Sequence, residues 1–586
     1  MPSYEVQNHK LFKVDDEGER KLLCNFVPEI TEEVRYVDGL NTDTVLTIRG
    51  KMPGEGDGAT ELPEVKVSAK DWPNMAWVVQ AWGIRAVIGT GTSVKEDIRQ
   101  AMQLLSSPRV VTVHRALGWS QGAQARMYIH AGGAVGEKGE IADVRVQLAT
   151  ELSRYNLSTI VPAETGVNAS LDLVRKVGPH GVTWPLFAGV LAPLLGPVDF
   201  AIHLTGRTGT FKSELISLFL SHFGKMDARH LPGSWSSTAN ALEAQAYYAK
   251  NAPFVVDDFV PSGTSWQVRA YQQTADKLIR AQGNQAGRAR LNDTSNLQST
   301  MYPRGIIVST GEDTPEGHSV RARMLILELS PGDIAADELT RAQANRALYT
   351  ATTKGFVQWL AVSYNEELVA SNVERLRPKY VEIGHTRTPT MLARLVVTVG
   401  WWVRWLVDAK LASKALAQQL VAEAEAAIVA TGQEQRSYLE SADPCDLFAA
   451  GLRNVFGSGL GHVRSLNGGI PAKPTLLGWV EEGERGDVPT FKSRGPVVGW
   501  IDWKRGELLV EINTGYAVVK KVVGAELSLT KQTMLKRLRD AGFVTRSDDA
   551  RQRNTIRIKA DGQTRQVIAL HIEKVLDTQE VPSERE

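Results

Sequence analysis

The sequence of 586 residues has only two cysteines, Cys24 and Cys445, which lie far apart. This scarcity excludes a zinc site built from cysteines and argues against a disulfide framework, so we expect a reducing compartment such as the cytoplasm. The N-terminus lacks the charged and then apolar pattern of a signal peptide, and we predict no export. The most apolar long segment, around Leu392 to Leu411, is interrupted by four charged residues, which favours a buried helix over a membrane span; they are Arg394, Arg404, Asp408 and Lys410.

An excess of charge of one sign is also lacking, because 67 Lys and Arg residues oppose 66 Asp and Glu residues. Any basic surface that binds nucleic acid must therefore be local. Hydrophobic residues make up 43% of the chain and charged residues 23%, which is typical of globular proteins and excludes widespread disorder. The length accommodates three or four domains.

Periodicity divides the chain into four expected domains and predicts a multidomain α/β fold. Residues 1–150 are rich in short β-compatible runs, with one helix expected from Ser93 to Leu105. Residues 151–332 alternate strands with helices, which indicates a mostly parallel sheet. Residues 333–465 form a helical domain, since helix-forming residues dominate there. Residues 466–586 are expected to form a small α/β module.

A short apolar run, a turn with glycines and an amphipathic segment follow one another between residues 199 and 219, which predicts strand, loop and helix. The turn, Gly206-Arg-Thr-Gly-Thr-Phe-Lys-Ser213, differs at one position from the phosphate-binding pattern G-x-x-x-x-G-K-[ST]. In such a loop the backbone around Gly206, Gly209 and Thr210 surrounds phosphates, Lys212 reaches the outer ones and Ser213 ligates Mg²⁺. The alternative is an ordinary corner between a strand and a helix.

The position that departs from this pattern is Phe211, which replaces the second glycine. A positive φ is costly for a bulky residue, so we expect a negative φ at Phe211.

Two further strands are expected to end in polar residues beside this loop. The run from Ala252 to Phe259 ends in two carboxylates, where Asp257 would hold Mg²⁺ and Asp258 would orient the attacking water. The run from Pro303 to Glu312 ends in Ser309 and Thr310, and either hydroxyl is a candidate sensor of the γ-phosphate. For the carboxylates, the alternative is an acidic turn after an edge strand.

Two groups of arginines accompany these strands. Arg321 and Arg323 could stabilise the transferred phosphoryl charge from a neighbouring subunit, or they could be an ordinary surface pair. Arg288 and Arg290 lie in a predicted hairpin around Asn292-Asp293, which could hold a nucleic-acid backbone or be a solvated loop.

The C-terminal module combines a helix within residues 527–544 with two strands joined by Asp561-Gly562, a strong hairpin turn. This order is typical of a winged helix. Binding to DNA phosphates is expected from the positive charges on and before the hairpin, although many winged helices contact protein instead. These charges are Arg551, Arg553, Arg557 and Lys559.

For the isolated histidines and the clustered tryptophans we expect structural roles. His114 and His130 are expected to be structural or surface residues and not metal ligands. Trp401, Trp402 and Trp405 are expected to pack in a helical core and not to stack on a nucleotide.

Taken in order, the loop, the segment from Leu231 to Glu243, both polar-ended strands and the arginine pair resemble an AAA+ ATPase family of bacterial mobile elements. Its members are self-loading replicative helicases related to the minichromosome-maintenance and superfamily 3 helicases. The β-rich lead-in with Gly118-Trp119 and the C-terminal winged helix fit the same resemblance.

The resemblance implies a hexameric ring with ATP between subunits and DNA in the channel. Site residues of one subunit would be Lys212, Ser213, Asp257, Asp258 and Thr310. Arg321 or Arg323 would act on the neighbouring subunit's nucleotide, and Arg288 and Arg290 would contact DNA.

Two departures from the family are notable, because Phe211 replaces a glycine and Asp258 stands where most members have glutamate. No primase domain is recognisable, so priming would need a separate primase or initiator. The leading hypothesis is an ATP- and Mg²⁺-dependent DNA helicase, acting on single-stranded and forked DNA, that replicates a mobile element. The alternatives are an ATP-regulated DNA-binding initiator or scaffold without strand separation, and an interaction protein with a degenerate nucleotide site.

Overall fold

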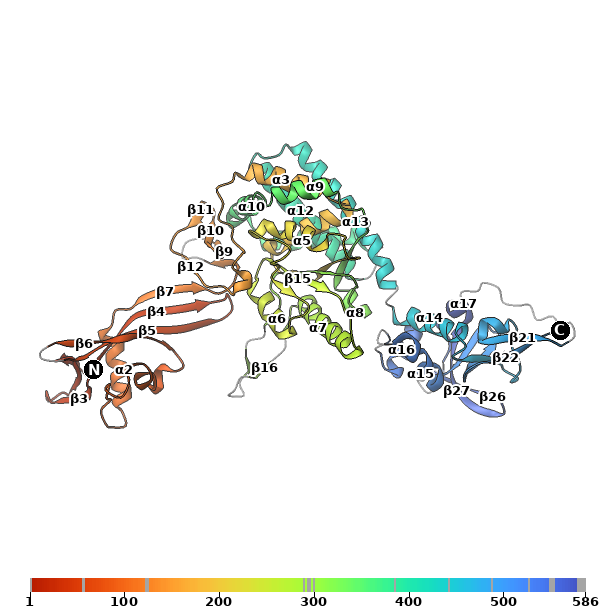
Figure 1. The fold of residues 1–586 in the computed structure, drawn as a ribbon, viewed down its shortest axis with the longest axis horizontal. Helices are drawn as coiled ribbons and strands as arrows, with labels where there is room; N and C mark the ends of the chain where they lie inside the picture. Colours follow the sequence, from red (N-terminus) through yellow and green to blue (C-terminus); the bar gives the residue numbers. More distant parts are fainter. Residues whose placement is uncertain are drawn as a thin grey trace. The chain divides into compact units, whose positions relative to one another are not determined.

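The computed structural model describes residues 3–54, 58–121, 126–287, 290–291, 297–298, 301–383, 386–440, 443–485, 488–524, 527, 529–547 and 554–576. The chain forms two compact units, drawn as a ribbon in Figure 1. The first unit comprises Met1–Asp313, Leu327–Leu376 and Ala393–Ile428, and the second comprises Thr314–Ile326, Arg377–Leu392 and Val429–Glu586.

The first 150 residues are rich in strands, as predicted. A five-stranded sheet has the order β12-β7-β4-β5-β6, and smaller sheets have the orders β1-β2-β3 and β11-β10-β9-β8. Helix α2, Val94–Leu105, confirms the one helix expected here. The strands are β1 Ser3–Gln7, β2 Lys10–Val14, β3 Arg20–Cys24, β4 Val27–Val37, β5 Thr42–Pro53, β6 Ala59–Ser68, β7 Arg109–His114, β8 Gly118–Gln121, β9 Arg126–His130, β10 Gly133–Gly136, β11 Gly139–Ile141 and β12 Arg145–Val146, and helix α1 is Trp77–Trp82.

A second five-stranded sheet, of order β14-β15-β18-β13-β19, lies in the following part of the chain. The pairs β14–β15, β15–β18 and β18–β13 are parallel, which confirms the expected parallel sheet. Continuous apolar runs suit these strands because a parallel sheet is buried on both faces. The strands are β13 Ala201–Gly206, β14 Gly233–Ser234, β15 Pro253–Phe259, β18 Ile306–Gly311 and β19 Met324–Leu329.

Helices cover both faces of this sheet, with α5 on one side of β15 and α6 and α7 on the other (Figure 1). Helix α4 is apolar around its whole circumference, and every residue from Val182 to Leu191 is buried. Phe187 of α4 packs edge-on against Trp402, with ring centroids 4.9 Å apart. The helices are α3 Ala163–Lys176, α4 His180–Leu191, α5 Lys212–Leu220, α6 Ala239–Tyr248 and α7 Ser265–Asn284.

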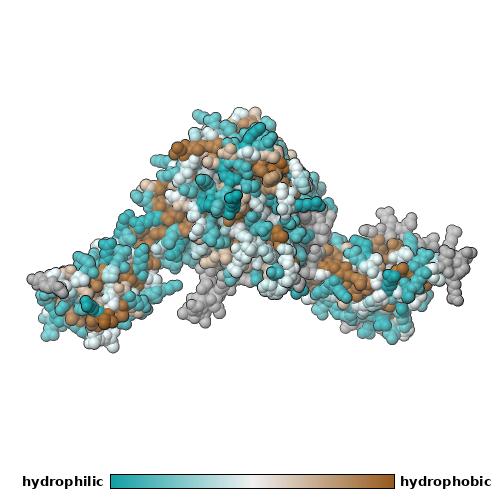
Figure 2. Space-filling model, viewed as in Figure 1, coloured by the Kyte–Doolittle hydropathy of each residue, from teal (hydrophilic) through white to brown (hydrophobic). Residues whose placement is uncertain are grey.

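The region after β19 is helical, as predicted. Its helices are α9 Ala336–Ala344, α10 Tyr349–Ser363, α11 Glu366–Leu376, α12 Thr388–Asp408 and α13 Lys414–Glu440. Helix α12 is long and apolar enough to cross a membrane, but 72% of its most apolar window is buried inside the protein. Trp401, Trp402 and Trp405 are all buried, which confirms that they pack in a core. On the face drawn in Figure 2, hydrophobic residues form separate patches among hydrophilic ones.

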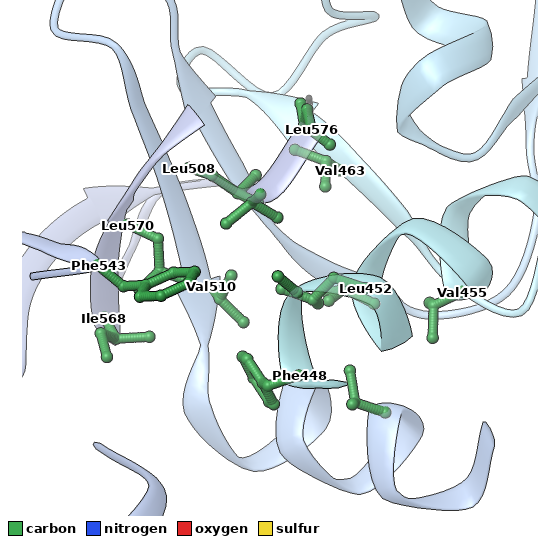
Figure 3. Packing of buried hydrophobic residues seen from close by; sticks show 14 of the residues in the cluster. Phe448, Leu452, Val455, Val463, Leu508, Val510, Phe543, Ile568, Leu570 and Leu576 are labelled. Carbon is green, nitrogen blue, oxygen red and sulfur yellow. The ribbon is translucent and has the colours of Figure 1, made fainter. Parts of the chain in front are cut away.

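The C-terminal part of the second unit has a sheet of order β20-β23-β24-β27-β25, with β26 paired to β27. Figure 3 shows its core, where Phe448 and Leu452 of α14 face Leu508 and Val510 of β24. The elements are α14 Pro444–Gly457, β20 His462–Ser465, β21 Trp479–Arg485, β22 Val488–Ser493, β23 Val497–Asp502, β24 Glu507–Glu511, α15 Ile512–Val523, α16 Lys531–Asp540, β25 Val544–Arg546, β26 Ile556–Ala560, β27 Gln563–His571 and α17 Ile572–Leu576.

Two local predictions in this part are confirmed. Helix α16 lies within the expected residues 527–544 and is capped by Thr530, whose side chain accepts a hydrogen bond from the Thr533 N–H. Strands β26 and β27 are antiparallel and are joined by Asp561 and Gly562, with φ of 52° and 73°. Two consecutive positive φ angles are the signature of the tight hairpin turn that Asp-Gly favours.

Candidate functional site

The loop between β13 and α5 is a compact turn whose first residue must be glycine. Gly206 has φ of 155°, and a Cβ there would lie 2.3 Å from the Leu329 carbonyl oxygen. Farther along, the Thr210 hydroxyl and N–H both bond to the Arg207 carbonyl, at 2.9 and 3.3 Å. Gly209 has φ of 87°, with open space where its Cβ would be. Successive N–H groups in such a turn form a concave surface suited to an anion.

Phe211 adopts the left-handed conformation, with φ of 62° and ψ of 23°, so the expectation of a negative φ is wrong. This conformation costs about 1–2 kcal/mol for a residue with a Cβ. The side chain is 47% exposed, so it points out of the loop without entering the core. The Phe211 carbonyl accepts the first helical hydrogen bond of α5 from the Leu215 N–H at 2.8 Å. The left-handed residue therefore lies directly before α5 and accepts its first hydrogen bond.

Lys212 begins α5 and bends back over the loop. Its Nζ donates to the carbonyl oxygens of Gly206 and Arg207, at 2.7 and 2.9 Å. Partial burial lowers the pKa of Lys212, and the negative charges of Glu312, Asp257 and Asp258 oppose that shift. The ammonium group therefore lies among carboxylates at one edge of the sheet.

Hydroxyl groups from two elements converge on Asp257 at the end of β15. Asp257 Oδ1 accepts a hydrogen bond from the Ser213 hydroxyl at 2.9 Å and another from the Thr310 hydroxyl. Thr310 in turn accepts from the Asp258 N–H at 3.1 Å. One network thus joins the first turn of α5 to the carboxyl ends of β15 and β18.

A β-bulge separates the two carboxylates. The pairing of β15 with β18 shifts register between Val256 and Phe259, where one extra residue of β15 is inserted. Asp258 takes φ of 68° at this bulge and its side chain is exposed, whereas Asp257 is half-buried. The bulge therefore turns Asp257 towards Ser213 and Asp258 towards solvent.

The structure distinguishes the two hydroxyls at the end of β18. Ser309 is buried and bonds to Trp235 Nε1 at 2.9 Å and to His203 Nδ1 at 3.0 Å. Because successive strand residues point to opposite faces, Thr310 alone faces Asp257.

Glu312 is a residue near this network that motif reasoning missed. Its carboxylate accepts a hydrogen bond from the Thr208 hydroxyl of the loop. The signal available in the sequence was its spacing, since a residue two positions after Thr310 lies on the same face of an extended strand.

The two downstream arginines lie in the second unit, whereas the loop lies in the first. Arg321 ends helix α8, His318–Arg321, and its Nε donates to the Pro315 carbonyl at 3.1 Å. Arg323 Nη1 donates to the Ser319 carbonyl and hydroxyl, both at 2.7 Å. Their predicted role across a subunit boundary stays a prediction.

Of the residues predicted to contact DNA, Arg288, Arg551 and Arg553 lie outside the described residues. Arg290 begins β16, Arg290–Leu291, which pairs antiparallel with β17, Leu297–Gln298, and confirms the expected hairpin.

Arg557 and Lys559 are both exposed on β26, alternating with residues that face the interior. They therefore share one face of the hairpin, although a role in DNA binding is untested.

The two histidines considered as ligands have structural surroundings. His130 is buried, and its Nδ1 accepts from the Gly132 and Leu157 N–H groups at 3.1 and 3.3 Å. Burial lowers the pKa of His130 to about 4 and also lowers that of His114. Within the described part of the chain, no three His, Cys, Asp or Glu side chains gather closely enough to hold a metal ion.

Comparisons with known proteins give a family match and a fold. Residues 183–300, which contain the loop and the Asp257 strand, match a family described as a domain of unknown function, DUF927. No curated protein matches the chain. The chain is similar to a solved structure described as SCCmec type IV Cch, active helicase, with 15% identity, a TM-score of 0.52, and 98% of this chain and 99% of that chain covered. That likeness shows a shared fold.

A second solved structure, the apo C-terminal region of NrS-1, matches at 10% identity over 70% of this chain and 90% of that chain. Its TM-score of 0.21 is too low to support an argument.

Proposed function

We propose that this chain is an ATP- and Mg²⁺-dependent DNA helicase or translocase that acts in the replication of a plasmid, phage or other mobile element. The observation that carries the proposal is the network joining Ser213, Asp257 and Thr310 beside Lys212. A hydroxyl at the start of a helix and a carboxylate at a strand end are the metal-holding groups of phosphate-loop nucleotide hydrolases. The full-length fold similarity to Cch, described as an active helicase, supports the same proposal.

In this proposal the loop is a phosphate loop. The backbone from Gly206 to Thr210 and the Lys212 ammonium bind the phosphates, because the turn and this cation both lie at the N-terminus of α5. To do so, Lys212 exchanges its bonds to loop carbonyls for bonds to phosphate oxygens.

The donors around Asp257 fit Mg²⁺, which prefers oxygen ligands and is held by one or two protein groups together with phosphates. Ser213 Oγ and Asp257 Oδ1 lie 2.9 Å apart and would hold the ion. When bound, Mg²⁺ supplies charge neutralisation on the phosphates. Asp258, exposed beyond the bulge, orients the attacking water, and Thr310 contacts the γ-phosphate or that water.

The ring assembly and DNA contacts belong to the same proposal. We propose a homohexamer in which Arg321 or Arg323 reaches the nucleotide of a neighbouring subunit, as the family resemblance implies. DNA, single-stranded or forked, would be held by the hairpin with Arg288 and Arg290 and by a C-terminal winged helix. The basic residues of that wing would be Arg551, Arg553, Arg557 and Lys559.

The decisive experiment combines ATP turnover with strand displacement on forked DNA carrying 3′ or 5′ tails. The wild-type protein should displace a strand only with ATP and Mg²⁺. Lys212→Ala should abolish both activities and leave the circular dichroism spectrum unchanged, whereas Lys225→Ala, at an exposed lysine after α5, should retain both. Full turnover by Lys212→Ala would show that the phosphate-loop assignment is wrong.

The strained Phe211 favours a second candidate, an ATP-regulated DNA-binding initiator or scaffold, because a distorted loop can bind nucleotide and hydrolyse it slowly. ATP-dependent DNA binding without strand displacement on either tailed substrate would select this alternative.

A further inference from the structure

The backbone of Glu312, just after β18, is hydrogen-bonded to both neighbouring strands, β15 and β13. Its N–H donates to the Phe259 carbonyl of β15 at 3.2 Å. Its own carbonyl accepts from the Thr205 hydroxyl of β13, also at 3.2 Å. Because both neighbouring strands fix its backbone, the Glu312 side chain has a defined place beside the loop.

From this place the carboxylate reaches the loop itself. Thr208, the second residue after Gly206, donates its hydroxyl hydrogen to Glu312. Glu312 is also the foremost of the negative charges acting on Lys212, ahead of Asp257 and Asp258. An anion is thus hydrogen-bonded to a loop whose proposed ligand is itself an anion.

The charges at this edge do not favour a free triphosphate. Lys212 and the exposed Arg207 are the cations of the loop, and the charges of Asp257, Asp258 and Glu312 all act on Lys212. Asp257 accepts two hydroxyl hydrogen bonds, whereas Glu312 accepts one, from the loop. Phosphate oxygens that took the place of the Thr208 hydroxyl would lie beside the Glu312 carboxylate, and the two negative charges would repel each other.

We propose that Glu312 makes nucleotide binding conditional on a divalent cation. It repels the outer phosphates unless a cation on Ser213 and Asp257 neutralises them. This inference rests on the proposed function, because it assumes that the loop binds a nucleoside triphosphate.

The expected change in ATP affinity is that of removing one exposed charge. Because Glu312 is exposed, its charge acts on a phosphate several ångströms away mainly through water, which changes a binding constant by about tenfold. Glu312→Gln keeps the shape and can still accept from Thr208, so the substitution removes the charge alone. ATP affinity measured in EDTA should therefore rise by about tenfold, whereas affinity with excess Mg²⁺ should change by less than about threefold.

The measurement is calorimetric titration of ATP into the full-length protein, in EDTA and in Mg²⁺. Glu367→Gln, at an exposed glutamate of α11, is the matched control and should behave like the wild type. Thr208→Val removes the hydroxyl and keeps the charge, so it should retain the wild-type dependence on Mg²⁺. If Thr208→Val reproduces Glu312→Gln, loop release and not charge is responsible, and the inference is wrong.

The remaining outcomes separate the two proposals. If the wild-type protein binds no ATP even with Mg²⁺, the proposed function fails. If it binds ATP with Mg²⁺ but Glu312→Gln has the same ratio of affinities in EDTA and Mg²⁺, only the role of Glu312 is refuted. Circular dichroism should show that each variant is folded.

Discussion

The loop after β13 and the hairpin of β26 and β27 differ in the partners of their charged side chains. Around the loop, Lys212 bonds to carbonyls and Asp257 accepts two hydroxyls. On β26, Arg557 and Lys559 stand opposite the uncharged Gln566 and Thr564. An organised set of polar contacts suits chemistry that needs fixed positions. Exposed cations that lie opposite uncharged residues suit a ligand such as a phosphate backbone, which needs charge more than geometry.

A third region, strand β5, shows that two cations spaced two residues apart do not by themselves make a DNA-binding surface. Arg49 and Lys51 of β5 are also two residues apart and exposed, but they form ion pairs with Glu64 and Glu61 of β6. Two strands with the same basic pattern therefore differ in their cross-strand partners, and of these two β26 is the candidate DNA contact.

The largest effect should come from breaking the contacts at the loop. Asp257→Ala removes the acceptor of both hydroxyls and the proposed metal ligand, so ATP turnover should fall on the order of a thousandfold. Steady-state phosphate release measures this. Asp172→Ala, at an exposed residue of α3, should retain wild-type turnover. An Asp257→Ala protein with more than about a tenth of wild-type turnover would contradict the assigned role.

Acid should weaken the unit that carries the loop. Burial lowers the pKa of His222 from 6.5 to about 4, so this imidazole is neutral in the folded protein down to low pH. The unfolded chain takes up the proton near pH 6.5, so stability is full above that pH and falls as the pH drops towards 4. His222 alone accounts for a loss of about 3 kcal/mol.

Calorimetric unfolding from pH 7 to pH 4 measures this loss. His222→Gln should be less stable at pH 7 but should show a flatter pH dependence. His230→Gln, at a more exposed histidine, should keep the slope of the wild type. An unchanged slope in His222→Gln would assign the acid sensitivity to other groups.

At the hairpin, the double substitution Arg557→Ala and Lys559→Ala should weaken DNA binding by about tenfold at moderate salt. The slope of log affinity against log salt concentration should become shallower by about two, because two phosphate contacts are lost. Fluorescence anisotropy with forked DNA measures both. The pair Arg49→Ala and Lys51→Ala should leave affinity and slope unchanged, and equal effects of the two pairs would refute the comparison.

The smallest effect is expected at Phe211. Replacement by glycine relieves about 1–2 kcal/mol of left-handed strain, part of which is lost to the greater freedom of glycine in the unfolded chain. We expect a net gain of about 0.5–1 kcal/mol in the free energy of unfolding. Phe211→Ala keeps a Cβ and serves as the control, since it should show no such gain.

Local periodicity predicted the elements around the loop well. The apolar runs that became β13, β15 and β18 and the amphipathic start of α5 are read from neighbouring residues. Their common edge follows from the rule that the carboxyl ends of parallel strands coincide.

The details that decide chemistry depended on tertiary contacts. The residues around Asp258 do not predict the bulge that exposes it, because the bulge arises from the pairing of β15 with β18. In the sequence Ser309 and Thr310 are equivalent candidates, and only the hydrogen bonds of Ser309 to His203 and Trp235 distinguish them. Glu312 became a candidate only when Thr208, more than a hundred residues earlier, was found beside it. Phe211 shows that a steric rule can be overridden when a helix start fixes the backbone.

The apolar helix α4 has a consequence for biosynthesis. Phe187 rests on Trp402, which a ribosome makes roughly 200 residues later, or on the order of 10–40 s at typical rates of synthesis. Throughout that interval α4, a helix without a polar face, lacks the contact with Trp402 that buries Phe187 in the folded protein. A nascent chain stalled soon after β19 should therefore recruit chaperones or aggregate, although the loop and its strands are already complete.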